Sequence, residues 1–174
     1  MAKGYAHVQG FDYEDTFAPT TWLTTIRSVL ALTASEGWPM YLKEEVYVEQ
    51  PLGFQGDLKE EVYVEQPRGF VLLGSKDKVC KLKKALYGLK QAPWAWYQQI
   101  DAYFLWNKFK RSSSNDCLYI FKKGGKCMIV ALYVDDLIMT RNHEDKISQM
   151  KQMLSGEFEM IDLRQMHFCL GIEV

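Results

Sequence analysis

The stretch Met128–Thr140, which reads MIVALYVDDLIMT, constrains the fold of this chain more than any other part of its sequence. An apolar run leads into two adjacent aspartates, Asp135 and Asp136, and a second apolar run follows them. Runs of this length that are interrupted by a polar pair are typical of two buried β-strands joined by a tight turn. The sequence therefore predicts a β-hairpin with two carboxylates at its tip.

The rest of the sequence predicts a mixed α and β fold. Apolar residues that recur every three to four positions predict helices at Trp22–Ser35, Ala92–Trp106 and Asn142–Ser155. Further strands are expected at Cys117–Phe121 and Cys127–Val134, on either side of a Gly124-Gly125 turn. Met166–Val174 is expected to form either another strand pair or an extended end. Thr20 or Thr21 and Asn142 are the expected N-caps, and Gly37 is the expected end of the first helix. The buried faces are expected to consist of Trp22, Leu23, Ile26, Val29, Leu30 and Thr33 in the first helix, Trp96, Ile100, Tyr103 and Phe104 in the second, and Ile147, Met150, Met153 and Leu154 in the third.

Composition narrows the class of protein. With 48% hydrophobic residues, the chain has enough apolar side chains for a sizeable core. A formal net charge of -1 gives no general case for a nucleic-acid partner, so any basic surface has to be local. The four cysteines show no CxxC spacing, so we expect reduced thiols rather than a zinc site or a disulfide framework. Because the sequence has neither an apolar leader nor a run of about 20 apolar residues, we expect an intracellular protein that does not enter the membrane.

The two aspartates at the expected hairpin tip have two interpretations. Aspartate is a common turn residue, so a solvated turn would also contain such a pair. The functional interpretation is a divalent metal site, because Mg²⁺ prefers carboxylate oxygens and two-metal phosphoryl transfer places the ions about 4 Å apart. Such a site needs at least one more carboxylate from another strand.

Five blocks of the sequence resemble the reverse transcriptases of copia-type long-terminal-repeat retrotransposons, in order along nearly the whole chain. The YVDD of Tyr133–Asp136 is similar to the catalytic turn of that family, and the other blocks are Ala2–Arg27, Gly56–Phe70, Lys78–Tyr97 and Met166–Val174. The resemblance implies an α+β fold in which an antiparallel sheet, the palm, packs on helices, with part of the fingers and no thumb. Residues 1–37 and 60–91 would form the fingers and residues 38–59 and 92–174 the palm of a single partial domain.

The resemblance also implies an activity, RNA-templated DNA synthesis with two Mg²⁺ (or Mn²⁺) ions. The partners would be an RNA or DNA template with its primer and deoxynucleoside triphosphates, in the cytoplasm (within a virus-like particle) or in the nucleus. Asp135 and Asp136 would be the catalytic metal ligands. The nucleotide and template site would include Lys3, Phe54, Tyr87, Gly88, Lys90, Gln91 and Pro93, and the primer grip would include Leu170 and Gly171.

A lysine-rich strip precedes the second helix. The lysines at positions 78, 81, 83, 84 and 90 alternate with apolar residues and with Tyr87. Such a strip suits a phosphate backbone, although a solvated strand face would have the same pattern.

A duplication interrupts the resemblance. Leu42–Phe54 and Leu58–Phe70 are copies that differ only at Leu52 and Arg68. Two copies are too few for a solenoid, which needs at least about three stacked units. The second copy matches the family in place, so the first copy lies over the strand on which the family carries its first catalytic aspartate. The stretch Met40–Gln55 contains no aspartate.

Three alignments of this strand remain open. Counting forward from Trp38 places Glu44 at the family's aspartate, and counting back from Asp57 places Val48 there. Allowing one deletion places Glu49 there, and this alignment is the one we favour for a third metal ligand. Glutamate is one methylene longer than aspartate, and a misplacement of about 1 Å can cost about 100-fold in rate because Mg²⁺ geometry is strict.

Three other positions depart from the family. Trp22 and Trp94 stand where the family usually carries arginine, and Arg141 stands where it often has glycine. A tryptophan cannot make the charge-assisted contacts of an arginine. The sequence therefore predicts a fragment of a retrotransposon reverse transcriptase with impaired catalysis. The alternatives are an inactive retroelement relic and a non-enzymatic module that binds primer and template.

Overall fold

The computed structural model describes residues 17–45, 61–66, 74, 77–83, 89–143, 145–158, 160–166, 168–169 and 172–173. Its helices are α1 (Leu23–Glu36), α2 (Ala92–Trp106) and α3 (Asp145–Glu157). Its strands are β1 (Met40–Glu45), β2 (Tyr63–Glu65), β3 (Val79–Lys81), β4 (Lys110–Ser112), β5 (Asn115–Lys123), β6 (Lys126–Tyr133), β7 (Asp136–Arg141), β8 (Met160–Gln165), β9 (Phe168–Cys169) and β10 (Ile172–Glu173). None of the helices within these residues is long and apolar enough to cross a membrane.

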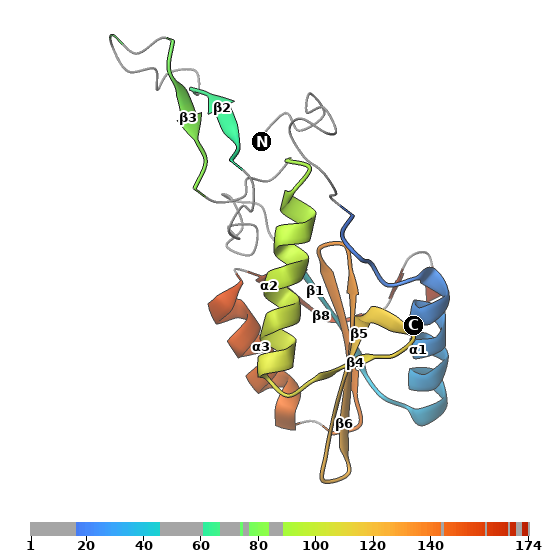
Figure 1. Cartoon of the computed structure of the whole chain (residues 1–174). Coiled ribbons are helices and arrows are strands. Elements are labelled where there is room, and N and C mark those ends of the chain that lie inside the picture. Colours follow the sequence, from blue (N-terminus) through green and yellow to red (C-terminus); the bar gives the residue numbers. More distant parts are fainter. Residues whose placement is uncertain are drawn as a thin grey trace.

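One six-stranded sheet organises the fold, with its strands in the order β4-β5-β6-β7-β1-β8. Every neighbouring pair in this sheet is antiparallel, which confirms the expected α+β class with an antiparallel sheet. The strands β2 and β3 form a separate pair, and Figure 1 shows this pair projecting away from the main sheet. The expected C-terminal strand pair is also present, as β9 and β10.

Helices cover both faces of the main sheet. Figure 1 shows α2 and α3 on one side of the sheet and α1 on the other. Because side chains alternate along a strand, β7 contributes Leu137 and Met139 to the core under α2 and α3, and Ile138 to the core under α1. The sheet is therefore shared by two cores that lie back to back.

The second helix follows the sequence prediction closely. It spans Ala92–Trp106 as expected, and a proline occupies its first turn, where the missing N–H group costs nothing. Trp96, Ile100 and Phe104 are all 1% exposed or less, so these three are confirmed as buried, whereas Tyr103 is only partly buried. The first helix ends as expected at Gly37, whose φ of 63° is the left-handed conformation that glycine adopts without strain.

The start of the first helix differs from the prediction. Its N-cap is Trp22, which makes no side-chain capping hydrogen bond, rather than Thr20 or Thr21. Trp22 is 67% exposed and Leu23 is 42% exposed, so the expectation that both are buried was wrong. Trp22 has an extended backbone and precedes the first helical turn, so the helical period does not place it on the buried face.

The third helix also begins later than predicted. Asn142 is not its N-cap, because α3 begins at Asp145. Instead, Asn142 accepts the Cys127 N–H at 2.7 Å and donates to the Gly125 carbonyl at 2.8 Å, which fastens the β5–β6 hairpin. The expectation that Met153 is buried was also wrong, because its side chain is 42% exposed.

Candidate functional site

The two aspartates lie at a hairpin tip, as the sequence predicts. Tyr133 pairs with Asp136 at the end of the β6–β7 ladder, so Val134 and Asp135 form a two-residue turn. Val134 has a φ of 55°, a left-handed conformation that is sterically costly for a β-branched residue. Both aspartates are half-buried. A strained turn of this kind persists only where its surroundings hold it in place.

Two segments from opposite faces of the sheet hold this turn. The Val134 N–H donates to Thr20 Oγ1 at 3.3 Å, and the Val134 carbonyl accepts from Trp96 Nε1 at 3.2 Å. One residue along from Thr20, the Thr21 N–H donates to the Leu132 carbonyl at 3.0 Å. The carboxylates therefore stand on a backbone that is fixed both by the segment before α1 and by α2.

The neighbouring strand β1 continues with an acidic residue, Glu44, directly after its last pair with β7. The strands β1 and β7 pair from Met40↔Thr140 to Lys43↔Leu137. The same register, if continued by one residue beyond that last pair, would bring Glu44 opposite Asp136. Directly opposite residues in an antiparallel pair have Cα atoms about 4.5–5.5 Å apart. Of the three alignments left open by the sequence, the one through Glu44 is the one that falls on a described strand.

Not all of the metal ligands that the sequence offered on this strand lie within the described residues. For residues 43–45 it gives the backbone alone, and Val48, Glu49 and Phe54 lie outside the described residues. Within the part of the chain that the structure describes, no group of three or more His, Cys, Asp or Glu side chains could hold a metal ion.

The expected nucleotide site is described in part. Gln91 stands at the N-cap of α2, with Lys90 exposed before it and Pro93 exposed in the first turn. This end of α2 is one turn from Trp96, which contacts the hairpin tip, so the structure brings these residues toward the aspartates. The remaining expected site residues, Lys3, Tyr87, Gly88, Leu170 and Gly171, lie outside the described residues and stay predictions.

The lysine-rich strip is partly engaged by an acidic partner. Lys81 on β3 forms an ion pair with Glu61, and this hydrogen bond raises the pKa of Lys81 and lowers the pKa of Glu61. Lys78 and Lys83 are exposed nearby. Because the charge of Lys81 is offset by Glu61, the positive charge that this part of the strip offers to a ligand comes mainly from Lys78 and Lys83.

Two groups in the core have strongly raised pKa values. Burial raises the pKa of the Cys117 thiol to about 12. Burial and the neighbouring Asp101 carboxylate also raise the pKa of Tyr119, whose hydroxyl donates to Asp101 at 3.0 Å. Asp101 in turn pairs with Arg111 at 2.7 Å. This network joins α2 to the sheet and has a structural role.

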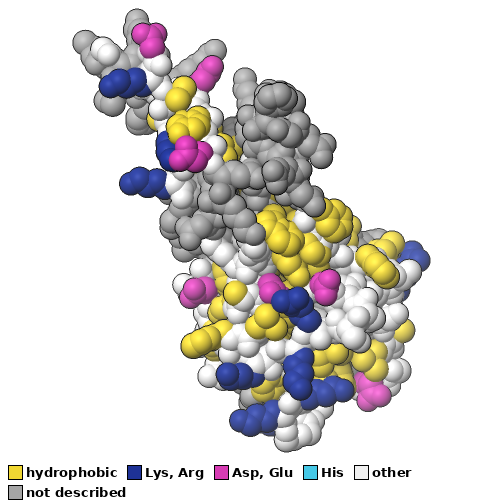
Figure 2. All heavy atoms as spheres, in the orientation of Figure 1, with side chains coloured by type: hydrophobic (Ala, Val, Ile, Leu, Met, Phe, Trp, Pro, Cys, Tyr) yellow, Lys and Arg dark blue, Asp and Glu magenta, His cyan; other side chains and the backbone are white. Residues whose placement is uncertain are grey.

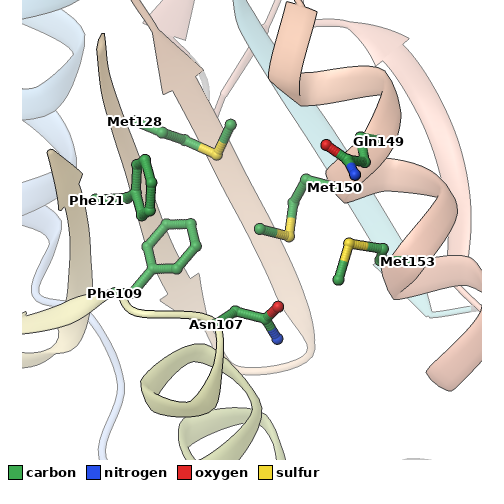
Figure 3. A pocket seen from close by; sticks show the side chains of 7 residues that line it. All are labelled: Asn107, Phe109, Phe121, Met128, Gln149, Met150 and Met153. Atoms are coloured by element: carbon green, nitrogen blue, oxygen red, sulfur yellow. The ribbon is translucent and has the colours of Figure 1, made fainter. Parts of the chain in front are cut away.

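Two cavities differ in their distance from the aspartates. One, of about 300 Å³, is lined by Thr20, the same residue that contacts Val134, and it is completed by Phe17, Pro19, Trp22, Ser113, Ser114, Asn115 and Asp116. The other, of about 220 Å³, lies between the end of α2 and α3, where phenylalanine and methionine side chains face one another (Figure 3). Its lining includes Phe121 and Met128, which pair near the far end of the β5–β6 hairpin, away from the aspartates.

Thr20, Thr21 and Trp96 are the site residues that the sequence analysis missed. It assigned the two threonines to helix capping and the tryptophan to the core. Each makes a hydrogen bond to a hairpin residue that is between 38 and 114 positions away in the sequence. No local signal in the sequence marks such bonds.

Comparisons with known proteins agree with the resemblance in the sequence. Residues 1–174 match the family described as reverse transcriptase (RNA-dependent DNA polymerase). The chain is 38% identical over 185 residues to the Retrovirus-related Pol polyprotein from transposon RE2 of Arabidopsis thaliana, an alignment that covers 99% of this chain and 12% of the relative. It is 37% identical over 188 residues to the Retrovirus-related Pol polyprotein from transposon TNT 1-94 of Nicotiana tabacum, which covers 100% of this chain and 13% of the relative.

A more distant relative is a putative transposon Ty5-1 protein of Saccharomyces cerevisiae, which is 32% identical over 133 residues, with 76% of this chain and 38% of the relative covered. No solved structure matches the chain. The chain thus spans about 12% of the length of the first plant relative that it matches.

Proposed function

The chain belongs to the reverse transcriptase (RNA-dependent DNA polymerase) family, and from this premise we propose that its site is built to add a deoxynucleotide to a primer. The chain is homologous to copia-type Pol polyproteins over its whole length. The observation that carries the proposal is the hairpin tip that bears Asp135 and Asp136, together with the β1–β7 register, whose last pair, Lys43↔Leu137, comes one residue before Glu44 and Asp136. The main sheet with α2 and α3 would be the palm of the polymerase.

The chemistry of these three acidic residues suits the divalent ions that the family implies. Asp135, Asp136 and Glu44 supply carboxylates alone, which is the chemistry that Mg²⁺ prefers. Bound Mg²⁺ would stabilise the charge that develops on the transferred phosphoryl group. The chain's own contribution is to hold the carboxylates on a turn that Thr20 and Trp96 fix from both sides.

The register of β1 favours Glu44 over Glu49 as the third ligand. Groups that share a metal pair must converge on one place, and the β1–β7 register, continued by one residue, would place Glu44 opposite Asp136. Glu49 stands five residues farther along the chain, outside the described residues. We therefore propose Glu44 as the acidic residue that stands in for the family's aspartate.

We expect the activity of this chain to be weak. A glutamate reaches about one methylene farther than the aspartate that it replaces, and Mg²⁺ tolerates little misplacement. A second candidate function is binding of primer and template without synthesis, which is favoured by the absence of aspartate from Met40–Gln55.

Primer extension on poly(rA)/oligo(dT) with Mg²⁺ or Mn²⁺ tests the proposal. Asp135→Asn and Glu44→Gln should abolish extension, whereas Glu49→Gln, the same substitution five residues away, should leave it unchanged. Glu44→Asp should raise the rate by about 10-fold or more, since it restores the shorter ligand. Loss of extension in Glu49→Gln but not in Glu44→Gln would refute the assignment of Glu44. No extension by either wild type or Glu44→Asp would leave the binding module as the function.

A further inference from the structure

We propose that Phe17 and Trp22 form a stacking site for an unpaired nucleobase next to the catalytic turn. This inference rests on the proposed function, because it names the part of the nucleic acid that the site receives. The two side chains are 74% and 67% exposed, and both line the cavity of about 300 Å³ beside the start of α1. Large exposed aromatic side chains that line a hollow are typical of binding surfaces.

Among the described residues, Trp22 has neither a capping nor a core role. It occupies the N-cap position of α1, where an oxygen-bearing side chain is usual, and an indole cannot accept the N–H groups of the first turn because it is a donor only. Its exposed side chain does not belong to either core. The family usually carries an arginine at this position, so this chain has an aromatic ring where its relatives have a positively charged side chain.

The walls of the cavity are held in place by hydrogen bonds between distant segments. Thr21 Oγ1 donates to the Cys117 carbonyl at 3.0 Å, and Asn115 Nδ2 donates to Thr25 Oγ1 at 3.2 Å. Both bonds join the start of α1 to the start of β5. A site that is fixed before the ligand arrives loses little freedom on binding, which favours affinity.

The chemistry of the opposite wall selects a base rather than a phosphate. Ser113 and Ser114 supply hydroxyl groups, and Asp116 supplies an exposed carboxylate. A carboxylate repels a phosphate group, but it accepts hydrogen bonds from the amino groups of bases. A base that stacks on Trp22 therefore finds polar partners at its edge.

The position of the cavity links it to the reaction. Thr20 lines the cavity, and its Oγ1 accepts the N–H of Val134 in the turn that bears Asp135. An unpaired base in the cavity therefore lies beside the place where a primer end would be extended. The single-stranded part of a template next to the primer end is the ligand with this chemistry.

Binding of primer–template DNA in the presence of EDTA tests the inference without requiring synthesis. The probes are a fluorescent duplex with a single-stranded template extension and the same duplex with abasic sites throughout the extension. Stacking of one base is worth about 5- to 150-fold in affinity, so wild type should prefer the intact extension by a factor in that range. Trp22→Ala and Phe17→Ala should each remove most of this preference, and Trp22→Phe should keep much of it.

Trp106→Ala is the matched control, because Trp106 is 83% exposed and is not part of the cavity lining. It should leave the preference unchanged. Trp22→Arg should also lose the preference while steepening the salt dependence of binding by about one ion. Equal preferences in Trp22→Ala, Trp106→Ala and wild type would overturn the inference.

The outcomes separate this inference from the proposed function. If wild type prefers the intact extension but never extends a primer, the proposed function fails and the stacking site stands. If wild type extends primers but binds both duplexes equally, the stacking site fails and the proposed function stands. If wild type binds neither duplex, both fail.

Discussion

Among single residues, Val134 has a backbone conformation that opposes its own side chain. Two non-glycine residues of the described chain have positive φ, and Val134 is the β-branched one. Such strain costs about 1–3 kcal/mol and is commonly found at functional sites. Here the N–H group and the carbonyl of the valine are both bound, to Thr20 and to Trp96, so contacts from the segment before α1 and from α2 offset the strain.

Val134→Gly should therefore raise the free energy of unfolding by about 0.5–1 kcal/mol, because glycine adopts positive φ without a steric cost. Urea denaturation measures this change. Val79→Gly is the matched control, since Val79 is equally exposed, at 55%, but lies in strand β3. There the same substitution should destabilise by about 1 kcal/mol, because glycine weakens a strand. A loss of stability at both positions would show that the turn is not strained.

Residue-level prediction from sequence succeeded where the chemistry was local. The adjacent aspartates and the Gly124-Gly125 turn could be recognised from a few neighbouring letters, and both glycines indeed have positive φ, at 57° and 75°. The support of the aspartates could not be recognised in this way. Thr20 stands where a helix-capping residue is expected, and only the fold brings it to a hairpin more than a hundred residues away in the sequence.

At the scale of elements, β1 is the clearest case in which the fold overrides the local pattern. Its sequence, MYLKEE, has three charged residues in six, yet it lies between β7 and β8 in the main sheet. Charged residues have low strand propensity, so the hydrogen-bonded pairing of β1 with β7 on one side and with β8 on the other must stabilise this strand. The helix α2 is the opposite case, because its apolar period and its proline define both ends. The strand β8 was not predicted at all.

The β5–β6 hairpin depends on a residue outside it. Asn142 binds the hairpin through Cys127 and Gly125, so Asn142→Ala should lower the free energy of unfolding by about 1–2 kcal/mol, the net worth of two hydrogen bonds. Asn107→Ala is the control, because Asn107 makes one such bond, to the Tyr103 carbonyl at 2.9 Å, and should cost about half as much. Equal losses in urea denaturation would contradict the role of Asn142.

For the molecule as a whole, charge is distributed unevenly although the net charge is -1. Figure 2 shows Lys and Arg side chains gathered at the end of the molecule where the β5–β6 hairpin lies. The exposed lysines there include Lys108, Lys110, Lys122 and Lys123. The composition could not reveal this basic region, because it averages over both ends of the sheet.

The two cores should unfold together, because one sheet forms a wall of each. Ile26 on α1 is 1% exposed in one core, and Ile100 on α2 is 0% exposed in the other. Replacing either by alanine should cost about 2–5 kcal/mol and should shift a single transition, measured both by far-UV circular dichroism and by tryptophan fluorescence. Leu32→Ala and Leu105→Ala, on the same two helices at 38% and 40% exposure, should cost much less.

The fluorescence signal makes this test sensitive to both cores, because Trp38 packs against the core under α1 and Trp96 is part of the core under α2. If Ile26→Ala produced a separate early transition, α1 would be an independent layer, and the turn would lose its Thr20 contact before the sheet unfolded. A single transition in both variants would instead mean that the sheet transmits the loss of either core to the other. The turn that bears Asp135, which the segment before α1 and helix α2 hold by hydrogen bonds, would then be as stable as the whole fold.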